Sequence, residues 1–333
     1  MTSRPTYARL LSATLLGIAL PIWILLLARS ADVGVDFYPL YFAAGRVRAG
    51  LSFYGADATA ALARVWTAPF AAAGIAYPLP LVLLVVPLSL LPLGIANCLW
   101  TAWGGATTFA AIRLAPEWRT LIPLPLLFLP FFRSAMLGQA TLVWFGLAAL
   151  ALLGMRARTP WLVGVACALL LLKPQNGLIF AIAGLLWSLR HERRGLLWFA
   201  GASLTLWGLA FAIQPGWLGA WVEQVQLYQR VVAPPSLLPA GALLLLACWR
   251  LPWWALAAAA QVVLFPLSDL YSALPLLFCW VAIGGPLALV GAGSSWLWSL
   301  LGLPNSLEAL WLALLWPLVM CATLRTWLGV RRR

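Results

Sequence analysis

Long apolar runs alternate with short polar segments along the whole of the 333-residue chain. A helix that crosses the hydrocarbon core of a membrane needs about 20 mostly apolar residues. The candidate spans cover residues 10–28, 78–92, 94–113, 120–132, 140–155, 160–172, 177–189, 195–213, 237–249, 251–268, 270–284, 287–303 and 309–324. The pattern therefore predicts an all-α, polytopic membrane protein with about 11–13 transmembrane helices.

The run at 120–132 differs from the others because it is short and contains Pro123, Pro125 and Pro130. The loops on its two sides are expected on the same face of the membrane, so the chain between them must cross an even number of times. We therefore interpret 120–132 as a re-entrant or partial span. Its backbone N–H and C=O groups must form hydrogen bonds with protein or water.

The longest polar stretch follows the first apolar run, at about 29–76. It is rich in aromatic residues, and two parts of it, 38–47 and 56–66, have the pattern of short amphipathic helices that lie in the membrane interface. We interpret it as a structured first external loop. No other tract is long and polar enough to form a soluble domain, so residues 1–333 are expected to form a single transmembrane domain.

Composition supports this class of protein, because 64% of the residues are hydrophobic and only 9% are charged, against about 25% charged in soluble domains. The net charge of +13 comes from arginines scattered between apolar runs. Such scattering suits anionic headgroups and membrane lipids rather than nucleic acid, which is bound by a basic face on a polar domain. The five cysteines lie in apolar runs without ligand-like spacing, and there is no His cluster or DxD pair, so no disulfide, metal or cofactor is expected.

Arginine positions predict the orientation, because cytoplasmic loops carry an excess of positive charge. Arg4 and Arg9 precede the first run, Arg190–Arg194 separate two later runs, and Arg331–Arg333 end the chain. We expect both termini and residue 191 in the cytoplasm, with residues 36, 139, 173 and 269 on the external side of the plasma (inner) membrane.

Ionisable residues close to the hydrocarbon are costly, so each of them is a candidate for function. Asp36 lies in the aromatic sequence Val35-Asp36-Phe37-Tyr38, where burial would raise the pKa of its carboxyl group toward the range of a general base. An equally good interpretation is that Asp36 caps the following helix. Tyr77 precedes Pro78, which by itself indicates only that a helix starts there.

The pair Gly138-Gln139, beside Arg133, is a second candidate. At a helix start it could offer a backbone N–H and a side-chain amide to a ligand rich in oxygen. On these residues alone, a packing glycine and an interfacial glutamine are the simpler interpretation.

Lys173 is the only lysine in the chain, and Pro174 and Gln175 follow it. A fixed cation at this level suits a phosphate group, although a lysine at the end of a span also reaches the interface without any further role. Asp269 lies between two spans on the same side. It could bind a hydroxylated substrate or simply cap the next helix.

The order of these motifs resembles glycosyltransferase family 87: Asp36-x-Tyr38, then Leu51-x-x-Tyr54, Tyr77-Pro78, Gly138-Gln139 and Lys173-Pro174-Gln175. The resemblance covers about residues 30–190 well and the last third weakly, with Asp269 as its best marker there. It implies a GT-C-like fold and transfer of mannose or another hexose at the external membrane face.

The donor that the resemblance implies is a polyprenyl-phosphate sugar, and the acceptor is a lipid-linked sugar or a glycan. It also implies that Asp36 is the catalytic base and that Lys173 binds the donor phosphate, with Arg133 and Arg46 as weaker candidates. The donor and substrate site is completed by Gln139, Gln175, Tyr38, Tyr77 and Asp269.

Two other classes of function use similar numbers of spans. A transporter of small solutes or lipids predicts ionisable residues near the middle of the bilayer and helix breaks at symmetric positions. The charges here gather at one face instead, and no convincing internal repeat is present. A non-catalytic scaffold or lipid-handling subunit gives no reason for Asp36 and Lys173 to converge.

Overall fold

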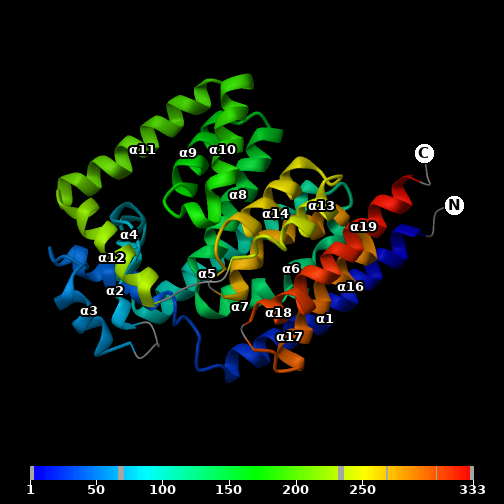
Figure 1. The fold of residues 1–333 in the computed structure, drawn as a ribbon, viewed down its shortest axis with the longest axis horizontal. Coiled ribbons are helices and arrows are strands. Elements are labelled where there is room, and N and C mark those ends of the chain that lie inside the picture. Colours follow the sequence, from blue (N-terminus) through cyan, green and yellow to red (C-terminus); the bar gives the residue numbers. More distant parts are fainter. Residues whose placement is uncertain (1–3, 67–70, 232–235, 268, 305, 331–333) are drawn as a thin grey trace.

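The computed structural model describes residues 4–66, 71–231, 236–267, 269–304 and 306–330. Within these ranges every regular element is a helix, which confirms the predicted all-α class. The elements lie in an elongated arrangement in which α2, α3 and α12 gather at one end (Figure 1).

The N-terminal part has one long helix followed by two short ones. Helix α1 (Arg4–Arg29) ends at the predicted first loop, which contains α2 (Tyr38–Arg48) and α3 (Ala56–Ala63). These two confirm the short helices expected at 38–47 and 56–66. Pro39 fits the start of α2, because its missing N–H would be unpaired there in any case.

Prolines divide the next apolar stretch. The candidate span at 78–92 forms α4 (Leu79–Val85) and a single 3₁₀ turn (Leu88–Leu90), because Pro87 and Pro92 interrupt the backbone ladder. Helix α5 (Leu93–Ala110) then begins directly after Pro92.

The proline-rich run is also broken, as its sequence predicts. It forms a 3₁₀ turn (Trp118–Leu121), α6 (Leu124–Leu127) and α7 (Leu129–Leu137). The segments Trp118–Leu127 and Leu129–Leu137 meet at an angle of 60°, which is the geometry of a broken span or a re-entrant loop. The break that the prolines predict in this run is therefore present, and its interpretation as a re-entrant or partial span stays a prediction.

The centre of the molecule is a group of closely packed helices. Helix α8 (Ala140–Arg156) is buried along nearly its whole length and contacts α5, α9 (Pro160–Leu170) and α10 (Pro174–His191). Helix α11 (Arg194–Ile213) crosses the outside of this group, and only Gly195 and Ala210 of it are buried. Its large exposed apolar surface is the kind that lipid covers in a membrane protein.

The remaining helices form the second half of the bundle. Residues 217–231, which lie outside the candidate spans, form the amphipathic helix α12 (Trp217–Val231). The later elements are α13 (Ala242–Cys248), α14 (Trp253–Leu264), η5 (Leu270–Leu276), α15 (Leu277–Ile283), α16 (Gly285–Gly293), α17 (Leu297–Leu300), α18 (Leu307–Leu310) and α19 (Trp316–Val330).

Full-length apolar helices are fewer than the 11–13 that the sequence pattern predicts. Among the described residues, Ser12–Arg29, Arg194–Ile213 and Leu307–Trp327 are long and apolar enough to cross a membrane, and the bent pair makes up to four. Shorter apolar helices include α8, α9, α14 and Leu270–Ile283. Hydropathy counts apolar residues but not helix breaks, so it merges short helices into apparent spans. Several apolar helices nevertheless remain, as expected of a polytopic membrane protein.

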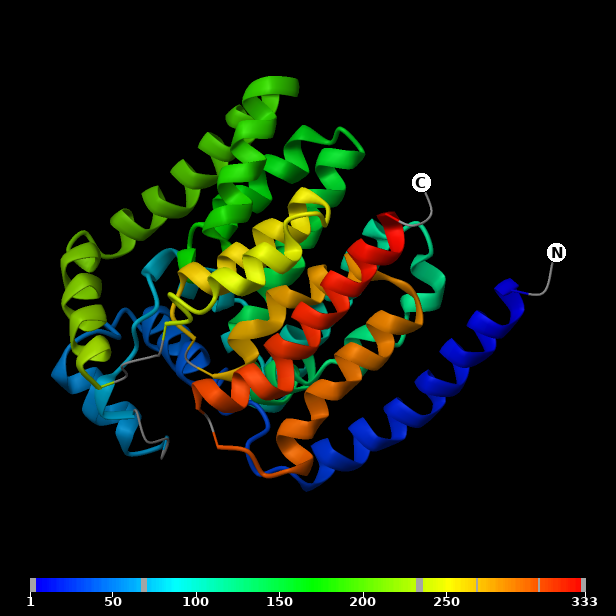
Figure 2. The ribbon, with the colours of Figure 1, turned by 45° about the vertical axis from the view of Figure 1, so that its right-hand side comes forward.

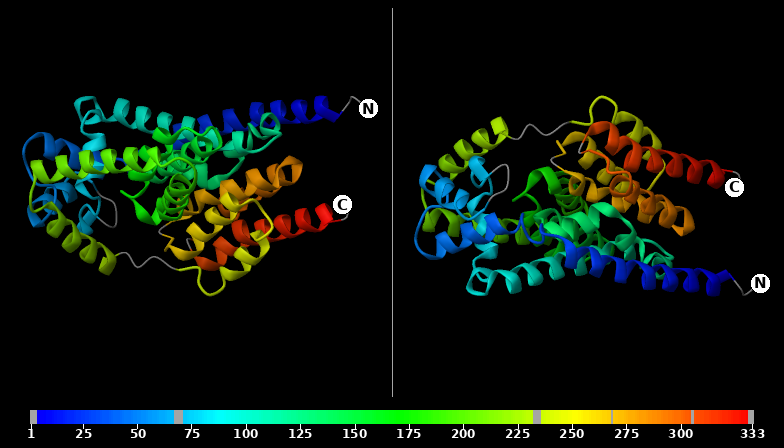
Figure 3. Two further views of the ribbon diagram at one scale, coloured as in Figure 1. Left: turned by 90° about the horizontal axis from the view of Figure 1, so that it is seen from above. Right: turned by 90° about the horizontal axis from the view of Figure 1, so that it is seen from below.

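Different helices lie at the two ends of the molecule. Helices α2, α3 and α12 lie at one end, while α1 begins and α19 ends at the other (Figure 3). Helices α1, α16 and α19 slope in the same direction toward that second end (Figure 2).

Candidate functional site

The loop between α1 and α2 is fixed to the end of α7 by backbone hydrogen bonds. The amide of Gly34 donates to the carbonyl of Met136 at 2.8 Å, and the amide of Asp36 donates to the carbonyl of Leu137 at 2.9 Å. These bonds place Asp36 beside the junction between α7 and α8, about a hundred residues later in the chain.

Gly138 permits this close approach. It ends α7 in the left-handed conformation, with φ +67°. A Cβ atom at this position would meet Asn97 Oδ1 at 2.5 Å and Phe37 Cβ at 2.8 Å, closer than van der Waals contact allows. The interpretation of Gly138 as a packing glycine is therefore correct, and its packing brings Asp36 and Gln139 together.

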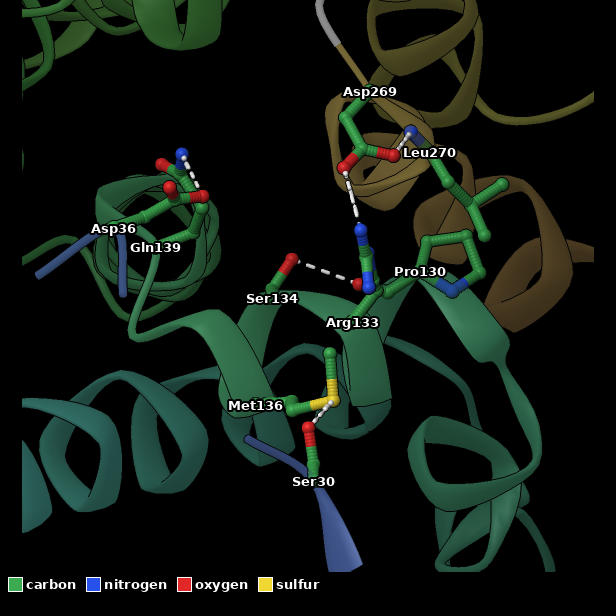
Figure 4. A network of polar contacts seen from close by, with 9 residues as sticks. All are labelled: Ser30, Asp36, Pro130, Arg133, Ser134, Met136, Gln139, Asp269 and Leu270. Carbon is green, nitrogen blue, oxygen red and sulfur yellow. Dashed lines mark hydrogen bonds and ion pairs between the residues drawn. The ribbon is translucent and has the colours of Figure 1, made fainter. Parts of the chain in front are cut away.

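Asp36 pairs with Gln139 across this junction. Gln139 Nε2 donates to Asp36 Oδ2 at 3.0 Å (Figure 4). Asp36 does not cap α2, because Phe37 occupies the N-cap position and no side chain caps that end. The capping interpretation is therefore wrong. Within the described ranges, no hydrogen bond engages the other carboxylate oxygen, Oδ1, so the structure leaves it available to a ligand.

Lys173 completes a chain of three side chains. Its Nζ donates to Gln139 Oε1 at 3.4 Å and lies 5.8 Å from the centre of the Tyr77 ring. The side chain is only 8% exposed, so Lys173 does not reach out to the interface as a snorkelling lysine does. Gln139 is also buried, and the expectation of an interfacial glutamine is wrong. One amide thus joins a buried cation to a carboxylate.

Two further contacts hold α8 against its neighbours near Lys173. Asn176 Nδ2 donates to Thr141 Oγ1 at 3.2 Å, and both side chains are buried. Trp144 Nε1 donates to the carbonyl of Leu170, at the end of α9, at 3.2 Å. The first contact fixes the start of α8 relative to the start of α10, and the second fixes α8 relative to the end of α9.

Arg133 and Asp269 form an ion pair beside this chain. Arg133 Nη2 and Nε lie 3.3 and 3.4 Å from Asp269 Oδ2, and the side chains are 36% and 20% exposed. Asp269 Oδ1 accepts from the amide of Leu270, so the helix-capping interpretation of Asp269 is correct. In Figure 4, Arg133 reaches from α7 toward Asp269 while Asp36 and Gln139 pair on the other side of the view.

Comparison with known proteins identifies the family. The sequence profile of glycosyltransferase family 87 matches residues 75–267, more than half of the chain. The chain belongs to glycosyltransferase family 87. The resemblance found in its motifs is thereby confirmed. No curated protein and no solved structure matches it.

Membership of glycosyltransferase family 87 gives the chain its general activity, that of a membrane glycosyltransferase. The matched range contains Arg133, Gln139 and Lys173. Asp36 precedes this range, and its place in the site comes from its contacts with Leu137 and Gln139.

Burial shifts the pKa values of Asp36 and Lys173, the two ionisable groups that Gln139 joins in this glycosyltransferase. Removal from water raises the pKa of the Asp36 carboxyl group, and the hydrogen bond from Gln139 opposes that rise. The negative charge of Asp269 adds to the rise, while Lys173 and Arg133 oppose it. Burial lowers the pKa of Lys173 to about 8, against the attraction of Asp36. A carboxylate that accepts a proton readily and an amine still charged at neutral pH therefore share one site.

The other residues expected in the site lie at different distances from this chain of side chains. Tyr38 is half-buried in the first turn of α2, and the Tyr77 ring lies beside Lys173. The side chain of Gln175 is exposed, and its backbone carbonyl accepts from Gln261 Nε2 at 2.9 Å. Arg46 is in the last turn of α2, about 12 Å along the helix from Tyr38 at its start, and its Nε donates to the carbonyl of Ser52.

Several buried polar residues near the site were missed in the sequence. They are Thr141, Asn176 and Gln261, each a polar side chain inside an apolar run. That position is itself a signal, because a polar group in hydrocarbon or in a protein core must have a partner. Among the described residues, no group of three or more His, Cys, Asp or Glu side chains could hold a metal ion.

Proposed function

We propose that this family 87 glycosyltransferase transfers mannose or another hexose from a polyprenyl-phosphate donor to a hydroxyl group of a lipid-linked or glycan acceptor. The observation that carries the proposal is the chain from Lys173 through Gln139 to Asp36. It sets a buried cation, suited to phosphate, beside a carboxylate with one oxygen free to take a proton.

The reaction is a single displacement. The acceptor oxygen forms a bond to the anomeric carbon of the sugar while the bond from that carbon to the phosphate oxygen breaks. Asp36 Oδ1 takes the proton of the acceptor hydroxyl, and the phosphate leaves with the electron pair of the broken bond. The ammonium group of Lys173 stabilises the negative charge that develops on the phosphate.

The neighbouring residues have supporting roles in this proposal. Gln139 positions both Asp36 and Lys173, because its amide donates to one and accepts from the other. Arg133, held by Asp269, is a second cation for the donor. Tyr38 and Tyr77 supply aromatic surface on which a sugar ring can rest. Arg46 has no part in it, because α2 holds it away from Asp36.

Transfer is proposed to take place at the external face of the plasma (inner) membrane, with both termini in the cytoplasm. Two observations support this orientation. The N-terminal end of α1 and the C-terminal end of α19 lie at the same end of the molecule, away from α2, α3 and α12 (Figure 3). Helix α10 begins beside Lys173 and ends at the Arg190–Arg194 cluster, which the positive-inside rule assigns to the cytoplasm.

The two ends of α10 provide a test of this orientation. In a chain whose native cysteines have been replaced, we expect an impermeant thiol reagent to label Gln175→Cys but not His191→Cys in intact cells. Both side chains are exposed in the structure, so access to the reagent depends on the side of the membrane. Labelling of His191→Cys alone would reverse the orientation, and permeabilised cells, in which both label, serve as the control.

The proposed activity is tested directly with purified protein in detergent. We expect incubation with polyprenyl-phosphate mannose and a glycan acceptor to yield a glycosylated acceptor and free polyprenyl phosphate in equal amounts. Polyprenyl-phosphate glucose, tested in parallel, distinguishes between hexoses. If no lipid-linked sugar is consumed while a nucleotide-linked sugar is, the proposed donor class is wrong.

A further inference from the structure

Gln261 is a buried amide on α14 that reaches into the first turns of α10. It is 1% exposed and lies in an otherwise apolar helix. Its Oε1 accepts from the backbone amide of Ile179 at 3.0 Å. Its Nε2 donates to the backbone carbonyl of Gln175 at 2.9 Å, with the carbonyl of Pro174 at 3.4 Å.

In a regular α-helix, the amide of Ile179 and the carbonyl of Gln175, four positions earlier, would form a hydrogen bond with each other. Gln261 bridges that same amide and carbonyl, so a side chain from another helix takes part in the hydrogen bonding of α10. Hydrogen bonds to the backbone fix the position of this turn relative to α14. Side-chain packing alone would allow the turn more freedom to shift.

The start of α10 is held from two sides. Pro174 is its first residue, and Lys173 before it has the non-helical angles φ −137° and ψ 75°, so Lys173 lies just outside the regular helix. On the side of α8, Asn176 is held by Thr141. Gln261 holds the same turn from the side of α14. The backbone that carries Lys173 is therefore clamped between two helices by buried polar contacts.

We propose that Gln261 is a positioning residue for Lys173. By fixing the first turns of α10, it sets where the Lys173 ammonium group lies, and so sets the affinity of the site for the phosphate of the donor. This inference rests on the proposed function of Lys173. It assigns to α14 a role in donor binding although Gln261 itself does not touch the donor.

Gln261→Met tests this role, because methionine has a similar length and an apolar end and so keeps the packing while removing three hydrogen bonds. We expect the KM for the polyprenyl-phosphate sugar to rise about tenfold, with a smaller change in kcat. Gln224→Met is the matched control. Gln224 is also a buried glutamine that donates to a backbone carbonyl, that of Ala73, but it lies on α12. Its replacement should leave the donor KM within about twofold of wild type.

A double-mutant cycle separates positioning from general support of the fold. In a Lys173→Met background, Gln261→Met should have little further effect on donor KM, because the group that it positions is absent. Equal effects of Gln261→Met in both backgrounds would overturn the proposal, as would a normal donor KM in the single variant. If Gln261→Met does not insert, Gln261→Asn replaces it, since its amide is one methylene too short to bridge the same groups.

Failure of this inference differs from failure of the proposed function. If wild-type protein transfers sugar and Lys173→Met weakens donor binding, but Gln261→Met does not, only the role of Gln261 is wrong. If Lys173→Met has normal donor affinity, the proposed role of Lys173 is wrong, and the positioning role falls with it.

Discussion

Replacing Asp36 with asparagine should lower the rate of sugar transfer by about 10²–10⁴-fold, the usual contribution of a general base. Asparagine keeps the shape of the side chain and can still accept the hydrogen bond from Gln139. It lacks the basic oxygen that takes the proton of the acceptor hydroxyl. The loss should therefore appear in kcat, measured with saturating donor and acceptor, while the donor KM changes far less.

The first external loop supplies matched controls for this variant. Asp32 and Asp57 carry the same charge and are exposed, outside the contacts that place Asp36. Asp32→Asn and Asp57→Asn should retain nearly all of the transfer rate. Because Asp36 does not cap α2, Asp36→Asn should insert and fold like wild type. Near-normal kcat in folded Asp36→Asn would show that another group is the base.

Loss of the cation at Lys173 should weaken donor binding by about 10–100-fold, the value of a charge-assisted contact to phosphate. Lys173→Met keeps most of the buried apolar stem and removes only the ammonium group. Binding of a polyprenyl-phosphate sugar can be measured by titration of the purified protein. Arg46→Met removes a positive charge from the far end of α2, and we expect it to leave donor affinity unchanged.

The pH dependence of binding gives a second test of the same residue. The pKa of Lys173 is lowered to about 8, so the ammonium form is present below that pH and is lost as the pH rises through it. Donor affinity of the wild type should therefore fall between about pH 7 and pH 9. Lys173→Met should show no such fall. A wild-type profile that stays flat through this range would contradict a binding role for the Lys173 cation.

Much of the helical architecture could be predicted from the apolar pattern, but its division into spans could not. The short helices in the first loop and the bend near Pro130 follow from local residues, because amphipathic spacing and proline act over a few positions. The number of full-length helices depends on where breaks such as Pro87 and Pro92 fall within apolar runs. Helix α12 was also missed, because its many polar residues are typical of a loop.

Part of the candidate site could likewise be predicted from the sequence, and part of it could not. The motifs and their order single out Asp36, Gln139 and Lys173, and the structure joins these three through one amide. Sequence could not assign that amide its partners, since they come from segments far apart in the chain. It also could not separate Arg46 from Arg133, because both look like available cations until the direction of α2 and the contact with Asp269 are known.

The contacts of the α1–α2 loop with α7 and α8 also determine when the site can form during synthesis. Asp36 and its partner Gln139 are separated by 103 positions, and a ribosome adds about 5–20 residues per second. Asp36 therefore leaves the ribosome about 5–20 s before the residue that orients it, and Lys173 follows later still. During this interval the amides of Gly34 and Asp36 lack their partners on α7, and the nascent enzyme is inactive until α7, α8 and α10 have joined the first loop. A variant that delays their docking would thus accumulate as an inserted chain with an unassembled site.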